Sequence, residues 1–330
     1  MQLKEYIEKN EDKNIYLPIR KFQIGEFLAE KYSTINNQKI TEILDKNFDK
    51  YITWDYENFA EEVEKEILET NLNLISCVSG WWTTMNSLAG KLISWEISLV
   101  DMVWIIASKP NIWAIDKAIK HKIHTVILNK FHAKDSETLN WLAKLFKADI
   151  IIWNWWLPLI PKEVIESFEW VILNQHPWPL RKNWLDFGWK WMYWTRVTAS
   201  RIIYLLKSWA TWNELFTEST IHIMTEEIDE WYSVWVKRLD IEFKIEEYRN
   251  AINNINNEDE KKELLIDLIS DIQISLLVLE HENVAETIEK VWITKTVEQH
   301  SSYDENLVPE ENKEILENSK KEAIKLFPSG

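Results

Sequence analysis

The stretch Leu74-Ile75-Ser76-Cys77-Val78-Ser79-Gly80 is a compact apolar run that ends in a turn, and it decides the fold. Directly after it, in residues 83–94, apolar side chains return at helical spacing. A short strand, a glycine-bearing turn and a helix make the first half of a βαβ unit. We therefore expect a parallel sheet that is built outward from this strand.

The same alternation continues along the chain. Further strands are expected at residues 97–107, 125–129, 150–153 and 171–175, with helices between them at residues 112–120, 136–147 and 161–167. After a long loop, a helix at residues 196–207 and two strands at residues 219–224 and 233–241 complete the pattern. Strands that alternate with helices in this way predict the α/β class, with a doubly wound, Rossmann-like and mostly parallel sheet.

Three segments of the chain differ in composition. Residues 1–70 are polar with a helical pattern, which predicts a helical N-terminal extension. Residues 71–242 hold the alternating strands and helices and are expected to form the catalytic domain. Residues 243–330 are strongly charged, which predicts an acidic helical C-terminal extension. We expect its tail, after about Gln299, to be poorly ordered.

The chain carries 38 Lys and Arg against 54 Asp and Glu, a formal net charge of −16. Such an acidic protein repels nucleic acid unless it has a dense basic patch, and the sequence has none. The single Cys77 excludes an intramolecular disulfide and fits a reducing compartment. No signal peptide opens the chain, no apolar run is long enough for a bilayer, and no Cys or His spacing suits a metal. We expect a cytoplasmic protein without nucleic-acid, membrane or metal partners.

Tryptophan and glycine occur in unusual numbers, 21 and 5. At the usual frequency of ~7% the chain would hold about 23 glycines. Several Trp stand where a turn needs a residue without a Cβ: Trp81 and Trp82 follow Gly80, and Trp178 lies between two prolines. We therefore hypothesise that most Trp are Gly in the natural protein, through UGA codons that mean glycine. UGG codons at most of these positions would instead indicate a genuinely tryptophan-rich chain.

Polar groups gather at the ends of three expected strands, at residues 79–84, 174–177 and 226–229. Taken singly, they are explained by a helix cap, a structural histidine and a capping aspartate. Ligands of open α/β sheets bind beyond the carboxyl ends of the strands. Together the three groups would supply an amide, an imidazole, a carboxylate and a phosphate-sized nest at that edge.

The string Val171-Ile172-Leu173-Asn174-Gln175-His176-Pro177 resembles the Asn-x-His-Pro signature of the folate-dependent formyltransferases. Residues 219–229 resemble the family's later strand and its Asp-bearing loop, and residues 74–86 resemble the phosphate loop of its glycinamide ribonucleotide (phosphoribosylglycinamide) branch. The resemblance covers about residues 72–242. The chain departs from the family in having Trp where compact residues are usual, at positions 81, 82, 178 and 231, and in a longer loop at residues 181–195.

The resemblance implies an enzyme that transfers a formyl group from 10-formyltetrahydrofolate to a phosphate-bearing amine, glycinamide ribonucleotide, in purine biosynthesis. It implies a catalytic set of Asn174, His176 and Asp229. The Asn174 amide and a protonated His176 would donate hydrogen bonds to the oxyanion of a tetrahedral intermediate. Asp229 would hold His176 as a cation and relay protons.

By the same resemblance, the substrate phosphate would be bound by Gly80, Thr83 and Thr84 at a helix start. The folate would be bound by six residues from two loops: Trp156, Leu157, Pro158, Ile160, Thr225 and Glu227. The plainer alternatives are a helix cap for the first group and an ordinary strand-exit turn around Pro158.

Two other functions stay open. One is a formyltransferase that acts on another amine, such as an amino-sugar nucleotide or methionyl-tRNA; the acidic, helical residues 244–326 argue against the tRNA enzyme, which would bring a basic C-terminal barrel. The other is a non-catalytic Rossmann-like binding module with helical arms. A binding module would not need Asn174, His176 and Asp229 to converge.

Overall fold

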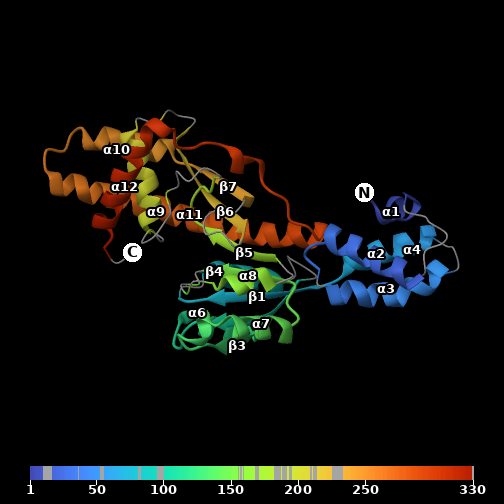
Figure 1. Cartoon of the computed structure of the whole chain (residues 1–330). Coiled ribbons are helices and arrows are strands. Elements are labelled where there is room, and N and C mark those ends of the chain that lie inside the picture. Colours follow the sequence, from blue (N-terminus) through green and yellow to red (C-terminus); the bar gives the residue numbers. More distant parts are fainter. Residues whose placement is uncertain are drawn as a thin grey trace. The chain divides into compact units, whose positions relative to one another are not determined.

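The computed structural model of the chain describes residues 1–9, 17–35, 37–52, 56–80, 83–94, 100–154, 156, 158, 160–167, 171–181, 187, 192, 195–208, 210, 214–224 and 233–328. The chain forms two compact units (Figure 1). Unit 1 comprises residues 1–173 and 288–298, and unit 2 comprises residues 174–287 and 299–330. The predicted division of the chain into an N-terminal extension, a catalytic domain and a C-terminal extension stays a prediction.

In the described part of unit 1, four strands pair in parallel, and a central one of them is buried. They are β1 (Leu72–Val78), β2 (Val100–Ala107), β3 (His124–Ile127) and β4 (Ile150–Asn154). Strand β1 pairs in parallel with β2 and with β4, and β2 pairs with β3. The side chains of β1 are almost all buried, as expected for a strand with neighbouring strands on both sides and helices on its faces.

Helices connect these strands, as the alternation predicts. They are α5 (Thr83–Ile93), α6 (Trp113–Lys120), α7 (Ser136–Leu145) and α8 (Lys162–Ser167). Helix α7 starts at a side-chain cap, because Asp135 accepts a hydrogen bond from the backbone N–H of Thr138. A 3₁₀ turn, η1 (His132–Lys134), precedes it.

Strand β5 (Val171–His176) begins in unit 1 and ends in unit 2, which adds β6 (Phe216–Ile223) and β7 (Ser233–Asp240). Strands β6 and β7 pair antiparallel. The strand order of the sheet is β3-β2-β1-β4-β5-β6-β7. The chain therefore reverses direction across the sheet between β1 and β4, and the predicted doubly wound, mostly parallel sheet is confirmed.

The described residues of the N-terminal part of unit 1 form four helices, as predicted. They are α1 (Leu3–Lys9), α2 (Leu17–Lys31), α3 (Asn37–Ile52) and α4 (Tyr56–Glu69), coloured blue in Figure 1. A partly buried carboxylate joins three of them, because Glu64 of α4 accepts hydrogen bonds from the Leu3 backbone and the Tyr32 hydroxyl and pairs with Lys31.

The last residues of unit 1 come from the far end of the sequence. Lys295 is fully buried, has a positive φ of 53°, and donates from Nζ to the Thr70 carbonyl at 2.9 Å. Its own carbonyl accepts from the Thr34 backbone N–H. Burial lowers the pKa of Lys295 to about 8. Lys295 thus joins the turn after α2 and the residue at the end of α4 that leads into β1.

In the described part of unit 2, four helices pack with the strands. They are α9 (Thr195–Lys207), α10 (Glu242–Ile252), α11 (Glu258–Thr294), whose last residues belong to unit 1, and α12 (Lys313–Leu326). Four apolar residues of α11 are buried in the unit 2 core: Leu265, Leu268, Ile269 and Ile272.

The expectation of a poorly ordered tail after Gln299 is wrong. Two 3₁₀ turns, η3 (Ser301–Asp304) and η4 (Glu310–Asn312), lead into α12, which lies beside α9 (Figure 1). Leu316 and Ala323 of α12 are fully buried in the unit 2 core. Because they lie seven residues apart, they share one face of the helix, and their burial orders the tail.

No helix within the described ranges is long and apolar enough to cross a bilayer.

Candidate functional site

The end of β5 brings two of the three predicted catalytic residues together in unit 2. The Asn174 Nδ2 and His176 Nε2 atoms lie 2.9 Å apart. They can meet because alternate residues of a strand point to the same face. The Asn174 Oδ1 accepts the backbone N–H of Gln175 at 3.0 Å. This fixes the amide orientation: Nδ2 donates to His176, so Nε2 is the acceptor and the imidazole proton sits on Nδ1.

A second histidine, whose role the sequence did not indicate, lies beside the first. His222 of β6 is fully buried, and its ring centroid is 4.5 Å from that of His176. The register of β6 with β7 shifts between Ile221 and His222, so a bulge lies at this histidine. Bulges redirect side chains near functional sites. In the sequence, His222 lies inside an apolar strand, and nothing there indicates a contact with His176. The contact becomes evident only because β5 pairs with β6 in the sheet.

The described surroundings keep both histidines neutral. Loss of contact with water, with a further contribution from His222, holds the pKa of His176 well below its usual range. Burial lowers the pKa of His222 to about 3. The expected cationic His176 depended on the carboxylate of Asp229, which lies outside the described residues. Its assigned role therefore stays a prediction.

An indole also packs against the His176 imidazole. Trp178 is 8% exposed, and its ring meets that of His176 edge-to-face at a centroid distance of 4.0 Å. Its buried N–H has no acceptor among the described residues. Trp81 and Trp82 lie outside those residues. Trp178 also belongs to the buried core of unit 2, and the glycine hypothesis stays a prediction.

The predicted phosphate loop lies in unit 1, where β1 ends. Gly80 follows that strand, and Thr83 and Thr84 begin α5, with Thr84 buried. The preceding Ser79 hydroxyl lies 2.6 Å from that of Ser108 at the end of β2. Gly80 also lines a cavity of about 440 Å³ with Ile112, Trp113 and a cation, Lys109. Lys109 was not singled out in the sequence, although its place directly after a strand was a usable signal.

The predicted folate residues are described in part. Trp156, Pro158 and Ile160 follow β4 in unit 1, whereas Leu157, Thr225 and Glu227 lie outside the described residues. Strands β1 and β4 pair in parallel up to Val78 and Asn154. Within unit 1, the loops after these two strands therefore start from the same edge of the sheet. Their roles as phosphate and folate loops stay predictions.

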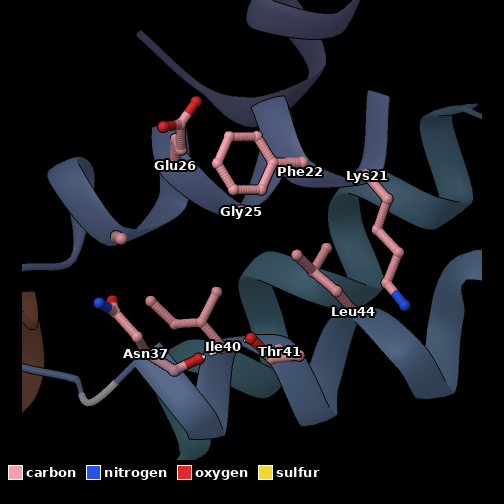
Figure 2. Close-up of a pocket in the computed structure, with 9 residues that line it drawn as sticks. Lys21, Phe22, Gly25, Glu26, Asn37, Ile40, Thr41 and Leu44 are labelled. Atoms are coloured by element: carbon pink, nitrogen blue, oxygen red, sulfur yellow. Dashed lines mark hydrogen bonds between the residues drawn. The ribbon is translucent and has the colours of Figure 1, made fainter. Parts of the chain in front are cut away.

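A separate pocket of about 370 Å³ lies between helices α2 and α3 in unit 1 (Figure 2). It is lined by Lys21, Phe22, Gly25, Glu26, Ala29, Asn37, Ile40, Thr41 and Leu44. None of the predicted site residues lines it. The described residues contain no group of three or more His, Cys, Asp or Glu side chains that would hold a metal ion.

The chain is similar in fold to solved structures of glycinamide ribonucleotide transformylases and phosphoribosylglycinamide formyltransferases. No protein-family model and no curated protein matches it. Glycinamide ribonucleotide transformylase 1 from Symbiobacterium toebii is 14% identical, with a TM-score of 0.49 over 67% of this chain and 88% of that one. The corresponding enzyme from Geobacillus kaustophilus is also 14% identical, with a TM-score of 0.49 over 67% and 99%. Phosphoribosylglycinamide formyltransferase from Anaplasma phagocytophilum is 15% identical, with a TM-score of 0.48 over 72% and 97%.

Proposed function

We propose that the chain is a phosphoribosylglycinamide formyltransferase, which moves the formyl group of 10-formyltetrahydrofolate to the amine of glycinamide ribonucleotide. The observation that carries this proposal is the contact between Asn174 and His176, at 2.9 Å, at the carboxyl end of β5. It places an amide donor and an imidazole side by side, in the sequence setting that resembles the Asn-x-His-Pro signature of this family.

The residue types suit the reaction. The amine nitrogen of the substrate attacks the formyl carbon, and the carbonyl oxygen becomes an oxyanion. One Asn174 Nδ2 hydrogen is used by His176, and the other is left to donate to that oxyanion. The bond from the formyl carbon to the folate nitrogen then breaks, and the proton lost by the amine passes to that nitrogen. A neutral His176 can take up this proton at Nε2 once its hydrogen bond with Asn174 breaks, and pass it to the folate nitrogen, with Asp229 stabilising the cation that forms in between.

The substrate phosphate is proposed to bind at the end of β1, where Gly80 and the first turn of α5 offer backbone N–H groups. Lys109 supports this assignment, because its cationic side chain lines the same cavity as Gly80. An anion at a helix start beside a lysine gains from both the helix dipole and the opposite charge.

A formylation assay with 10-formyltetrahydrofolate and glycinamide ribonucleotide tests the proposal. Asn174→Ala is expected to lower kcat about 10²–10³-fold by removing one oxyanion donor, with little change in KM. Asp229→Asn is expected to keep the fold and lower kcat by orders of magnitude. Asn254→Ala, at an exposed amide beyond α10, is the matched control and should keep full activity.

Full activity of the Asn174 variant would contradict the catalytic assignment. Assays with an amino-sugar nucleotide and with methionyl-tRNA separate the other acceptors, because only the true amine should be formylated at a rate that depends on Asn174. No product with any amine, in the presence of bound folate, would favour the binding module.

A further inference from the structure

The strand that carries Asn174 and His176 also has a back face, and a buried carboxyl group lies there. Between those two residues, Gln175 points to the opposite side of β5 because side chains alternate along a strand. Its Nε2 donates to Glu280 Oε2 of α11 at 2.8 Å. Both residues belong to unit 2.

This contact is shielded from water. Glu280 is 0% exposed and Gln175 is 9% exposed. Three residues further along α11, the equally buried Asn283 donates to the Ser219 carbonyl on β6 at 2.7 Å. One face of the helix therefore holds both β5 and β6 through polar bonds, from the side opposite to the histidines.

The hydrogen bond from Gln175 to Glu280 leaves one buried oxygen on each of the two side chains unsatisfied. Gln175 Oε1 and Glu280 Oε1 are both buried without a hydrogen-bond partner among the described residues. A buried polar atom without a partner costs about 1–3 kcal/mol. A single proton on Glu280 would satisfy both oxygens at once, since the acid O–H would donate to the amide oxygen while the amide N–H donates to the acid.

We propose that Glu280 is held as the neutral acid in a reciprocal, two-bond pair with Gln175, and that it is a positioning residue for Asn174 and His176. The inference rests on the proposed function for its catalytic consequence. The burial of Glu280 supports the neutral form. Burial raises the pKa of Glu280 to about 8, even though the hydrogen bond from Gln175 acts in the opposite direction. Two bonds fix the rotation of the Gln175 side chain, and with it the backbone between the two catalytic side chains.

The backbone matters because the Asn174 Oδ1 accepts the Gln175 N–H. A shift of Gln175 moves this donor and turns the amide away from His176. A misplacement of about 1 Å at a reacting group can cost about 10²-fold in rate. Position 280 should therefore influence catalysis through geometry, without touching substrate.

Two substitutions at position 280 test the pair. Glu280→Leu removes both bonds, and we expect kcat to fall about 10²-fold with KM nearly unchanged. Glu280→Gln keeps them, because its amide has an N–H where the acid carries its proton, so kcat should stay close to that of the unchanged chain. Asn283→Ala is the matched control: it removes a buried bond from the same face of α11 to β6 and leaves β5 alone.

A second readout is independent of turnover. In protein with isotope-labelled histidine, the NMR signals of the His176 imidazole nitrogens can be assigned with a His176→Asn variant. These signals should shift in Glu280→Leu and stay in place in Glu280→Gln and Asn283→Ala. If Glu280→Leu does not fold, the double variant Gln175→Leu with Glu280→Leu leaves no polar group without a partner and should show the same shift. An unshifted signal, or equal shifts in the Asn283 control, overturns the inference.

The two proposals fail differently. Shifted His176 signals in a protein that formylates no amine would remove the proposed function and leave the positioning pair. Normal formylation with unshifted signals and unchanged kcat in Glu280→Leu would remove the pair and leave the function.

Discussion

At the scale of single residues, Trp178 is a member of the unit 2 core that packs against His176. It fills the space beside His176, and its buried N–H finds no acceptor among the described residues. Truncating a genuine core Trp typically costs about 3–5 kcal/mol. If glycine belongs at this position, Trp178→Gly should cost clearly less free energy of unfolding than that and raise kcat/KM by uncovering the imidazole. Denaturant unfolding and the formylation assay measure both.

Trp292→Gly is the control for this substitution. Position 292 lies inside α11, where glycine is unfavourable by about 1 kcal/mol before any packing is lost. It should therefore destabilise unit 1 whatever the genetic code. If Trp178→Gly lowers the free energy of unfolding by the full amount typical of a core Trp, without a gain in activity, Trp178 is a genuine core residue.

Single residues also show how far a sequence predicts a site. Asn174 and His176 were predicted because they share a strand and a recognisable setting, and the strand geometry brings them together. His222 and Glu280 act through partners on other elements. Both lie within stretches whose periodicity indicates only a strand or a helix. Nothing local distinguishes a buried His or Glu that contacts a site from one that is exposed.

At the scale of elements, the order of strands and helices was predictable because the period of the apolar pattern changes at each boundary. Strand β6 begins at Phe216, three residues before the predicted start. The reason is Glu218, a charged residue that the pattern excludes from a buried strand. In the structure it is buried, with the Arg181 guanidinium donating to both carboxylate oxygens at 2.9 Å.

The helical character of residues 313–326 was predicted, but their ordered packing as α12 was not, because the many polar residues of this helix hide a narrow apolar face. Leu316→Ala should lower the free energy of unfolding by about 2–5 kcal/mol, since the side chain is fully buried in the unit 2 core. Glu317→Ala, an exposed neighbour in a surface ion pair with Lys320, should change it little. Equal, small effects of both substitutions would mean that α12 does not pack as described.

At the scale of the whole molecule, stability should depend on pH through two buried groups with opposite signs. Glu280 has a folded-state pKa of about 8, above its ordinary value of 4.5, so the folded chain binds the extra proton between these limits. Stability then falls as pH rises through this window, at roughly 1.4 kcal/mol per pH unit at most. Glu280→Gln should remove this slope in unfolding curves recorded from pH 5 to pH 8.

His222 affects the stability of the folded chain at acid pH. Its pKa falls from 6.5 to about 3 on folding, so the unfolded chain binds the extra proton and stability is lost as pH drops below 6.5. His222→Gln should make the acid part of the curve of stability against pH shallower, while the contribution of His176, whose pKa is also lowered, remains. The alkaline part should stay unchanged. A variant whose curve matches that of the unchanged chain in its acid part would show that His222 is not buried in its neutral form.

The burial of Lys295 has a consequence for biosynthesis. Unit 1 takes its last segment from residues 288–298, so the ribosome must translate 225 further residues after Thr70 before the Lys295 ammonium can bind the Thr70 carbonyl. A nascent chain that stalls between these two residues lacks this hydrogen bond. The earlier residues of unit 1 therefore remain incomplete until residues 174–287 of unit 2 have been translated.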